Sequence, residues 1–221
     1  MRATWGTLWT LTLLGTACPP PPAVTPEDAA HFFGLEPGRS LVYAVTGGPI
    51  PTTAHIDLVR NDSFADYLGF SATERNAGNI IQEVLLYGAE AENLRLTRVG
   101  DCLPNCTTYA NPPILLKVTG DDPETLELVE NTTYTTETAT QVTTSGGTAE
   151  GPRERHEITV SARVNTVTPA GTFSAYPVAW RKFVVGQSGS EDRLLYFAPQ
   201  RGFIRLDRGS LRYEVQGGVS P

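Results

Sequence analysis

The stretch Glu157-Ile158-Thr159-Val160-Ser161-Ala162-Arg163-Val164 alternates polar and apolar side chains. Because successive side chains of a β-strand point to opposite faces of a sheet, this period of two predicts a strand with one buried and one exposed face. An amphipathic helix would instead repeat its apolar residues every three or four positions. Residues 157–164 therefore predict a half-buried strand of an antiparallel sheet.

The same alternation recurs along most of the chain after residue 40. Turn-forming groups such as Gly47-Gly48-Pro49 and Asn111-Pro112-Pro113 separate the alternating runs at intervals of about 8 to 14 residues. A sheet of this size with one apolar face curls to bury that face. The predicted fold is all-β, an antiparallel meander of roughly ten strands curled into a barrel or half-barrel. The clearest runs are 41–45, 55–59, 93–97, 114–119, 125–129, 157–164, 204–207 and 211–215.

Two segments depart from plain alternation. Thr25-Pro26-Glu27-Asp28 supplies an N-cap residue, a proline at the first helical position and acids in the first turn, which predicts one short N-terminal helix ending at Gly34. Residues 132–148 are rich in threonine, and its β-branched side chain favours an exposed strand pair over a loose hairpin. Since no repeat or clear boundary occurs, residues 27–221 predict a single β domain.

The first 17 residues have the pattern of a secretory signal peptide. Arg2 is the only charge before Glu27, and an apolar or small-residue segment runs from Trp5 to Ala17. This segment is shorter than the roughly 20 apolar residues that a membrane-spanning helix needs. Residues 18–26 are predicted to form a linker, in which the prolines after Cys18 make a stiff polyproline spacer.

The exit from this segment, Leu14-Gly15-Thr16-Ala17-Cys18, resembles the lipobox of bacterial lipoproteins, although that family usually has leucine where this chain has Gly15. The resemblance implies that the Cys18 thiol receives a diacylglycerol and becomes the first mature residue. It also implies a protein held in the bacterial cell envelope, at the outer membrane, by an N-terminal lipid. The alternative is cleavage by an ordinary signal peptidase, which would give a secreted or periplasmic protein with an ordinary thiol at Cys18.

The net charge of the chain limits the classes of partner that it is expected to bind. The sequence has 17 Lys and Arg against 24 Asp and Glu, a formal net charge of −7, and it contains no basic run. Nucleic acids and anionic lipid headgroups are therefore poor partners. Since no second apolar span follows, the N-terminus is the expected attachment to the membrane.

Cys102 and Cys106 remain as an even pair if Cys18 is acylated. In an exported chain a pair this close predicts a disulfide that staples a hairpin tip. A zinc site would need four ligands, and a redox pair is usually Cys-x-x-Cys at the start of a helix. The sequence therefore predicts neither a metal nor a cofactor.

No motif points to catalysis. His31, His55 and His156 lack a second ligand at metal-binding spacing. Gly186-Gln187-Ser188-Gly189-Ser190 lacks the glycine spacing of a nucleophile elbow and predicts a turn. Asp121-Asp122-Pro123-Glu124 offers carboxylates to a calcium ion, but a solvated turn is the simpler interpretation. The sequence predicts a non-enzymatic protein without catalytic residues, with a hydrolase that uses scattered carboxylates as the least favoured alternative.

Three aromatic-bearing segments resemble, in the same order, a loose group of bacterial envelope lipoproteins of unassigned activity. That group carries Phe-Pro-Leu-x-x-Gly-x-x-Trp-x-Tyr, Pro-Ala-Gly-Thr-Phe and Tyr-Phe-Ala-Pro-Gly-Val-Gly segments. This chain departs from them at Leu35-Glu36-Pro37, at Leu41 and at Gln200-Arg201. The resemblance implies a curled antiparallel sheet, similar to lipocalin-like barrels or to the half-barrels of lipoprotein carriers, and it implies no catalytic residue. The matching segments are residues 32–43, 167–175 and 196–204.

The aromatic residues of the later segments are candidates for a ligand site. We expect Phe173, Trp180, Tyr196 and Phe197 either to pack in the core, the favoured interpretation, or to line the mouth of a ligand site. The sequence predicts a lipid-anchored envelope protein that binds an apolar ligand or a partner protein in or on the curled sheet. The alternative is a structural or assembly lipoprotein with a filled barrel, and the state of the interior separates the two.

Overall fold

The structure of the chain, a computed structural model, describes residues 23–61, 67–100, 102 and 105–219. The predicted signal peptide and Cys18 lie outside the described residues. Within them the chain forms one α-helix, one 3-10 helix and 17 strands. These elements are α1 (Pro26–Phe32), β1 (Ser40–Thr46), β2 (Thr52–Arg60), β3 (Leu68–Asn76), β4 (Ile81–Ala89), β5 (Asn93–Val99), β6 (Cys106–Tyr109), β7 (Ile114–Thr119), η1 (Pro123–Thr125), β8 (Glu127–Leu128), β9 (Thr132–Thr138), β10 (Thr140–Thr144), β11 (Gly147–Glu150), β12 (Glu154–Val160), β13 (Val164–Thr168), β14 (Gly171–Val184), β15 (Glu191–Ala198), β16 (Gly202–Arg208) and β17 (Leu211–Val219).

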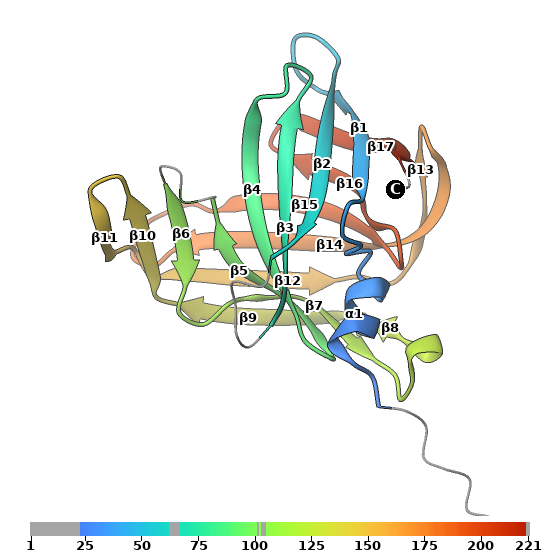
Figure 1. The fold of residues 1–221 in the computed structure, drawn as a ribbon, viewed down its shortest axis with the longest axis horizontal. Coiled ribbons are helices and arrows are strands. Elements are labelled where there is room, and N and C mark those ends of the chain that lie inside the picture. Colours follow the sequence, from blue (N-terminus) through green and yellow to red (C-terminus); the bar gives the residue numbers. More distant parts are fainter. Residues whose placement is uncertain (1–22, 62–66, 101, 103–104, 220–221) are drawn as a thin grey trace, which may run out of the picture.

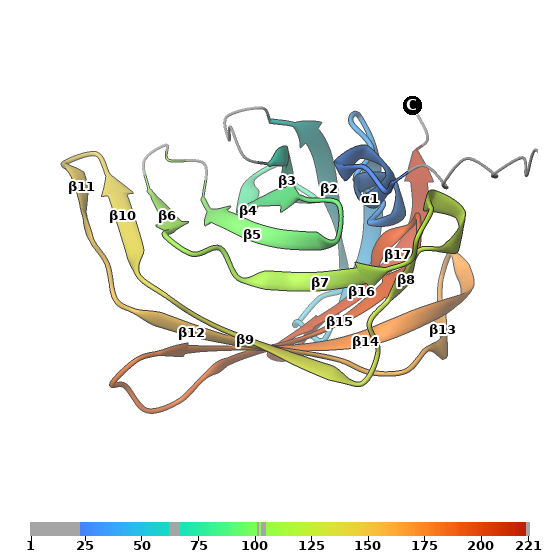
Figure 2. The same ribbon diagram turned by 90° about the horizontal axis from the view of Figure 1, so that it is seen from below.

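The long strands form one antiparallel sheet. They lie side by side in the order β9-β12-β14-β15-β16-β17-β1-β2-β3-β4-β5, and β5 also pairs with β6 and β7. Figure 2 shows this sheet curled into a trough, with β9, β12 and β14 along one side and β5 and β7 across from them. Among the described residues no pairing joins β7 to β9, so the sheet does not close along that line. The predicted all-β, curled half-barrel is confirmed.

A bent two-stranded ribbon accounts for several of the short segments. β9 pairs with β12. Beyond Ala139 these two strands continue as β10 and β11, which pair with each other, and β10 also pairs with β6. Figure 1 shows β10 and β11 at the far left of the molecule, beside β6. At the bend, the Ala110 N–H donates to the Ala139 carbonyl at 3.0 Å and the Gly151 N–H to the Thr140 carbonyl at 2.9 Å. The threonine-rich segment is therefore strand, as predicted, and the bends raise the number of strand segments above ten.

The stretch 157–164 forms a strand, but a shorter one than its alternation predicts. Ile158 and Val160 are fully buried, whereas β12 ends at Val160 and Val164, the first residue of β13, is 43% exposed. Both strands pair with the long β14, with Val160 opposite Val178 and Val164 opposite Ala175. The chain therefore carries one more residue than β14 between these two pairs, which is a bulge. The prediction of one continuous strand was wrong at residues 161–163.

α1 begins where the sequence predicts. Thr25 and Asp28 form a reciprocal capping box: the Asp28 N–H donates to Thr25 Oγ1 at 3.2 Å, and the Thr25 N–H donates to Asp28 Oδ2 at 2.9 Å. Pro26 occupies the first turn, where its missing N–H costs no hydrogen bond. The helix buries Ala29, Ala30 and Phe32 against the sheet, so it covers one end of the trough.

The end of α1 docks onto the turn between β15 and β16 through main-chain atoms. A Cβ atom on Gly34 would lie 2.5 Å from the Gly202 nitrogen, so only glycine permits this approach. The Gln200 N–H donates to the Phe32 carbonyl at 2.7 Å, and Arg39 Nη1 donates to the carbonyls of Gly34 at 3.3 Å and Gln200 at 2.9 Å. Gln200, which stands where the lipoprotein group has glycine, keeps a left-handed φ of 61°.

The core consists of two clusters. The larger one packs α1 against β3, β4, β5, β7, β12, β14 and β15, and contains the fully buried Leu96, Leu116 and Ile158. The smaller one joins β1, β16 and β17, and includes Tyr43, Ile204 and Val215. Between them, the inner faces of β1 to β4 and β16 leave space at the centre of the curled sheet.

Candidate functional site

An apolar cavity of about 60 Å³ lies inside the curled sheet. Its floor is the end of α1, at Phe33, Gly34 and Leu35, together with Gly202 and Phe203 at the start of β16. Its walls come from β1 to β4 and β16, and apart from two tyrosines and two carboxylates they are apolar. The wall residues are Leu41, Tyr43, Ile56, Leu58, Ala72, Glu74, Glu83, Leu85, Tyr87 and Leu206.

A second hollow of about 210 Å³, which we call the vestibule, lies at the other end of the same strands. It is bounded by the β1–β2 connection, the ends of β1 and β2, and Asn76, Gln82, Leu211 and Tyr213. Figure 1 shows the β1–β2 and β3–β4 connections together at the end of these strands opposite α1. Glu74 is the one residue that lines both the cavity and the vestibule, so its carboxylate stands between the two.

Strand phase explains why charged residues face the cavity. Phe70, Ala72 and Glu74 occupy alternate positions of β3 and are all buried, so Glu74 points to the same face as the apolar residues before it. The same alternation puts three further charged residues on the face of an apolar residue two positions away: Glu83 with Leu85 on β4, Arg193 with Leu195 on β15, and Arg208 with Leu206 on β16. We call Glu74, Glu83, Arg193 and Arg208 the charged quartet.

The quartet joins opposite walls of the curled sheet. Arg193 binds Glu83 with both terminal nitrogens, Nη2 to Oε1 at 2.9 Å and Nη1 to Oε2 at 3.0 Å. Arg208 Nη1 donates to Glu83 Oε2 at 3.0 Å, and its Nη2 lies 3.7 Å from Glu74 Oε1. Arg193 also donates to Glu191 and lies over the Trp180 ring, 5.0 Å from its centre. Both oxygens of Glu83 are therefore engaged, while Glu74 is held more weakly.

Sheet register pairs like charges within each wall. Glu74 lies directly opposite Glu83 on β3 and β4, and Arg193 lies directly opposite Arg208 on β15 and β16. Like charges placed opposite each other in a sheet are destabilising. Because the acidic pair faces the basic pair across the interior, each pair neutralises the other. The quartet therefore depends on the curling of the sheet.

Glu74 has an unusual ionisation. Burial, the largest cause, raises the pKa of this carboxyl above its usual range, and the neighbouring Glu83 adds to the effect. The Arg208 charge, a hydrogen bond with Tyr213 and the Arg193 charge act in the opposite direction without outweighing burial. Burial likewise raises the pKa of the phenols of Tyr43 and Tyr87, so both tyrosines present neutral O–H groups in the cavity region.

A second buried polar cluster, which we call the His156 group, consists of Tyr109, Glu154, His156 and Trp180. Trp180 Nε1 donates to His156 Nδ1 at 3.1 Å, and His156 Nε2 lies 3.1 Å from Glu154 Oε2. Since an indole N–H is only a donor, Nδ1 must accept, and the ring proton therefore resides on Nε2 and points to Glu154. Tyr109 packs edge-on against the imidazole and hydrogen-bonds Glu154. None of these four residues lines the cavity or the vestibule.

The four aromatic residues proposed as ligand-lining lie outside the walls of the cavity. Phe197 is fully buried against Phe32, Phe33 and Phe203. Trp180 belongs to the His156 group. Phe173 and Tyr196 are half-buried beside the smaller core cluster, with Arg205 stacked on Tyr196. These positions fit the favoured interpretation, core packing.

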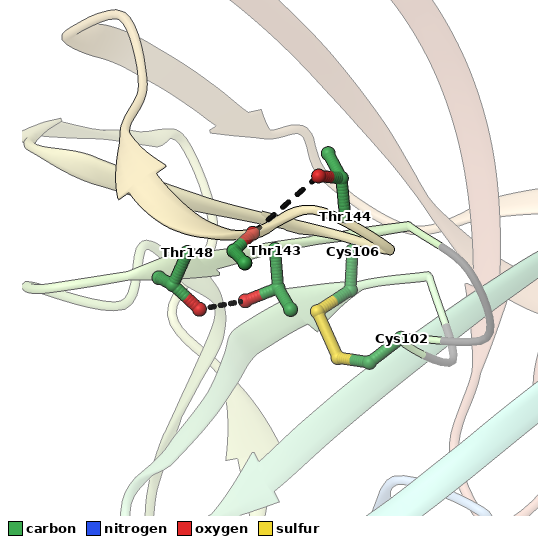
Figure 3. Close-up of a disulfide and its surroundings, with 6 residues drawn as sticks. Cys102, Cys106, Thr143, Thr144 and Thr148 are labelled. Atoms are coloured by element: carbon green, nitrogen blue, oxygen red, sulfur yellow. Dashed lines mark hydrogen bonds between the residues drawn. A yellow bond between two sulfur atoms is a disulfide. The ribbon is translucent and has the colours of Figure 1, made fainter.

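The predicted disulfide is present between Cys102 and Cys106, with Cα atoms 4.4 Å apart. Cys106 opens β6 and lies opposite Thr143 of β10. Figure 3 shows the disulfide beside the β10–β11 hairpin, where the hydroxyls of Thr143 and Thr148 are hydrogen-bonded at 2.9 Å. It therefore staples a peripheral tip, away from the cavity-lining residues.

The other chemistry-bearing residues are dispersed. His31 is exposed and pairs with Glu36 at 3.3 Å, and His55 lies half-buried on β2. Asp122 caps η1, accepting from the N–H groups of Glu124 and Thr125. Across the described part of the chain, no three His, Cys, Asp or Glu side chains are grouped closely enough to bind a metal ion. Neither helix in that part has the length and apolar character needed to span a bilayer.

Glu74 and Glu83 are the two ionisable groups in a cavity that a hydrolase would require. General acid–base catalysis by two carboxylates needs each to be free to exchange a proton with a bound substrate. Glu83, however, accepts three guanidinium hydrogen bonds at 2.9 to 3.0 Å. Glu83 is therefore held by two arginines, while Glu74 is the cavity carboxylate without a guanidinium at hydrogen-bond distance.

Comparisons with known proteins add little to the assignment. No family model matches the chain, and no curated protein matches it. A solved structure from Bacteroides fragilis, described as an exported protein with a YmcC-like fold, is 9% identical over 86% of this chain and 99% of its own, with a TM-score of 0.49. One from Parabacteroides distasonis, described as a lipoprotein, is 10% identical over 85% and 98%, with a TM-score of 0.47. At these values neither likeness assigns a family, and the resemblance to the lipoprotein group stays a prediction.

Proposed function

We propose that this protein is a lipid-anchored, non-enzymatic protein of the bacterial cell envelope that binds a small apolar molecule inside its curled sheet. The cavity of about 60 Å³ is the observation that carries the proposal. A void of this size costs on the order of 1.5 kcal/mol of folding free energy when it stays empty. Apolar cavities in proteins accept apolar molecules, so a ligand would recover that free energy.

The vestibule gives such a molecule a way in. Ile50, which lines it, is 76% exposed, and Ile80 on the β3–β4 connection at the same end is 62% exposed. Exposed apolar side chains at the rim of a hollow are typical of sites that receive apolar partners. The vestibule also contains Asn76, Gln82 and Thr52, which suit the polar end of an amphiphile.

The anchor is supported by the sequence around Cys18. It is tested by mass spectrometry of the N-terminal peptide from the membrane fraction of expressing bacteria. We expect a peptide that begins at Cys18 and carries acyl chains, and a Cys18→Ser chain that leaves the membrane fraction. An unmodified Cys18 in a soluble mature chain would overturn the anchor and leave the cavity untouched.

Ligand binding is tested by titration calorimetry with 1-octanol. We expect saturable binding to the unmodified chain, and a loss of affinity of about tenfold or more in Ala72→Leu, whose added methyl groups occupy the cavity. Ala179→Leu is the matched control, since Ala179 is exposed on β14, and it should bind as the parent does. Absence of octanol binding would favour the structural or assembly lipoprotein.

A further inference from the structure

We infer that the molecule bound in this cavity is a small amphiphile with a cationic head, a protonated amine, which sits against the Glu74 carboxylate while its apolar chain fills the cavity. This inference rests on the proposed apolar binding and adds to it the chemistry of the head. It follows from which charges face the open space, how they are partnered, and where they lie.

The charged side chains that face the open space are carboxylates. Glu74 and Glu83 line the cavity, and Glu74 also lines the vestibule. Arg193 and Arg208 line neither hollow, because they approach the carboxylates from the β15–β16 wall. A ligand head at this point therefore meets oxygen acceptors, and an anionic head such as a fatty-acid carboxylate would meet like charge.

Glu74 is the carboxylate with capacity for a further partner. It is 7% exposed, yet its contact with Arg208 is 3.7 Å, longer than a hydrogen bond, and Arg208 lies closer to Glu83 at 3.0 Å. Tyr213 hydrogen-bonds Glu74 but brings no positive charge, and the guanidinium groups of Arg193 and Arg208 are both bound more closely by Glu83. A buried carboxylate without a close counter-charge is under-compensated. An ammonium group, with three N–H donors and a full charge, supplies what is missing.

The position of Glu74 fixes how the amphiphile lies. The apolar walls at Leu41, Leu58 and Ala72 run from Glu74 towards the floor at Phe33, so an alkyl chain enters below the carboxylate. The vestibule lies on its other side, with room of about 210 Å³ for the substituents of the head. The head group and the alkyl chain of the amphiphile therefore lie on opposite sides of Glu74, and this carboxylate determines which head group is accepted.

The test compares three probes of equal chain length, octylamine, 1-octanol and octanoate, by titration calorimetry at neutral pH. We expect octylamine to bind about tenfold or more tightly than octanol, as a charge-assisted hydrogen bond would give, and octanoate to bind most weakly. In Glu74→Gln, which keeps shape and removes charge, octylamine should fall to the affinity of octanol, with octanol unchanged. Glu150→Gln, at an exposed position of β11, is the matched control and should keep the preference.

The outcomes separate this inference from the proposed function. If octanol binds but octylamine binds no more tightly than octanol or octanoate, the cationic head is wrong and apolar binding stands. If none of the three probes binds, both fail. Should Glu74→Gln not fold, the ranking of the probes on the unmodified chain still decides, because a preference for octanoate contradicts the inference directly.

Discussion

The His156 group and the charged quartet bury polar side chains on neighbouring strands of one sheet, but they do so in different ways. In the His156 group, each nitrogen of the imidazole has one partner, Trp180 on one side and Glu154 on the other. The group lies within the packed core, and its hydrogen bonds connect β12 with β14. Its polar atoms satisfy one another, so it gives no sign of a ligand.

The charged quartet connects strands that are distant in the sheet and lies beside open space. Arg193 on β15 reaches Glu83 on β4 across the interior. Arg208 divides its contacts between Glu83 and Glu74, which leaves Glu74 facing the cavity and the vestibule. The comparison shows that burial of polar groups is not itself the sign of a site. A buried carboxylate that borders open space and lacks a close counter-charge is such a sign.

The largest expected effect comes from breaking the cross-sheet contact. Arg193→Met keeps the apolar stem but removes the guanidinium, which leaves Glu83 and Glu74 directly opposite each other with Arg208 alone between them. Breaking a buried ion pair in this way costs about 3 to 5 kcal/mol, measured by urea denaturation. Arg181→Met removes an exposed arginine, 3.7 Å from Asp192, and should cost less than about 1 kcal/mol. Equal effects from the two variants would show that the quartet does not join the walls.

The His156 group should respond nearly as strongly. His156→Leu leaves the buried Trp180 N–H without an acceptor and removes one hydrogen bond from the Glu154 carboxylate, which keeps its bond with Tyr109. An unsatisfied buried group costs about 1 to 3 kcal/mol. We expect a loss of about 3 kcal/mol in the same denaturation experiment, with ligand affinity unchanged in the folded protein. His31→Leu, at an exposed histidine, should stay within about 0.5 kcal/mol. A loss of octanol binding in folded His156→Leu would contradict the separation of the two regions.

Added side-chain volume should affect stability differently in the packed core and at the wall of the cavity. Val160→Ile introduces a methylene at a fully buried position of β12 and should cost about 1 to 3 kcal/mol. Ala72→Val adds two carbons at the cavity wall, where space exists, and should be neutral or stabilising by up to about 1 kcal/mol. The measurement is the midpoint of thermal or urea unfolding. A large loss in Ala72→Val would mean that the cavity wall cannot accept atoms.

The smallest expected effect is a pair of opposite pH dependences. The raised pKa of Glu74 means that its contribution to stability is present at low pH and is lost as the pH rises through the folded-state pKa. The stability of Glu74→Gln relative to the parent should therefore increase from acid to neutral pH. Groups facing Glu74, namely Glu83, Arg193, Arg208 and Tyr213, remain in both chains.

Glu191, at the exposed edge of the same network, should show the reverse. Burial raises its pKa, but hydrogen bonds from Lys182 and Arg193 outweigh this and lower the pKa to about 2. Its contribution is thus present above the usual glutamate range and is lost as the pH falls towards about 2. Glu191→Gln should lower stability at neutral pH and have no effect near pH 2, an effect that salt reduces because the side chain is 41% exposed. If the stability of Glu74→Gln and that of Glu191→Gln, each relative to the parent, changed with pH in the same direction, the opposite pKa shifts of the two glutamates would be contradicted.

Much of the fold could be predicted from sequence, because alternation in runs such as 157–160 and 211–215 reports directly on burial in a sheet. The capping residues of α1 and the spacing of Cys102 and Cys106 were equally informative. The charged quartet was missed, although a signal was present: each member continues the inward phase of its strand, as Glu74 follows Phe70 and Ala72. What alternation cannot give is register across strands more than 100 residues apart in the chain, and the bond from Arg193 to Glu83 spans 110 residues. Without the register, a charged residue that points into the sheet interior cannot be distinguished in the sequence from a polar residue that ends a strand.

The docking of α1 on the β15–β16 turn has a mechanical consequence. The helix lies near the N-terminal end of the described residues, and main-chain hydrogen bonds and the Arg39 contacts attach its end to the turn at Gln200. A pull on the N-terminus, such as the proposed lipid anchor would transmit, is shared between β1 and this turn. Because Phe33, Gly34, Gly202 and Phe203 also form the floor of the cavity, such a load would reach the cavity through its floor, on the side away from the vestibule.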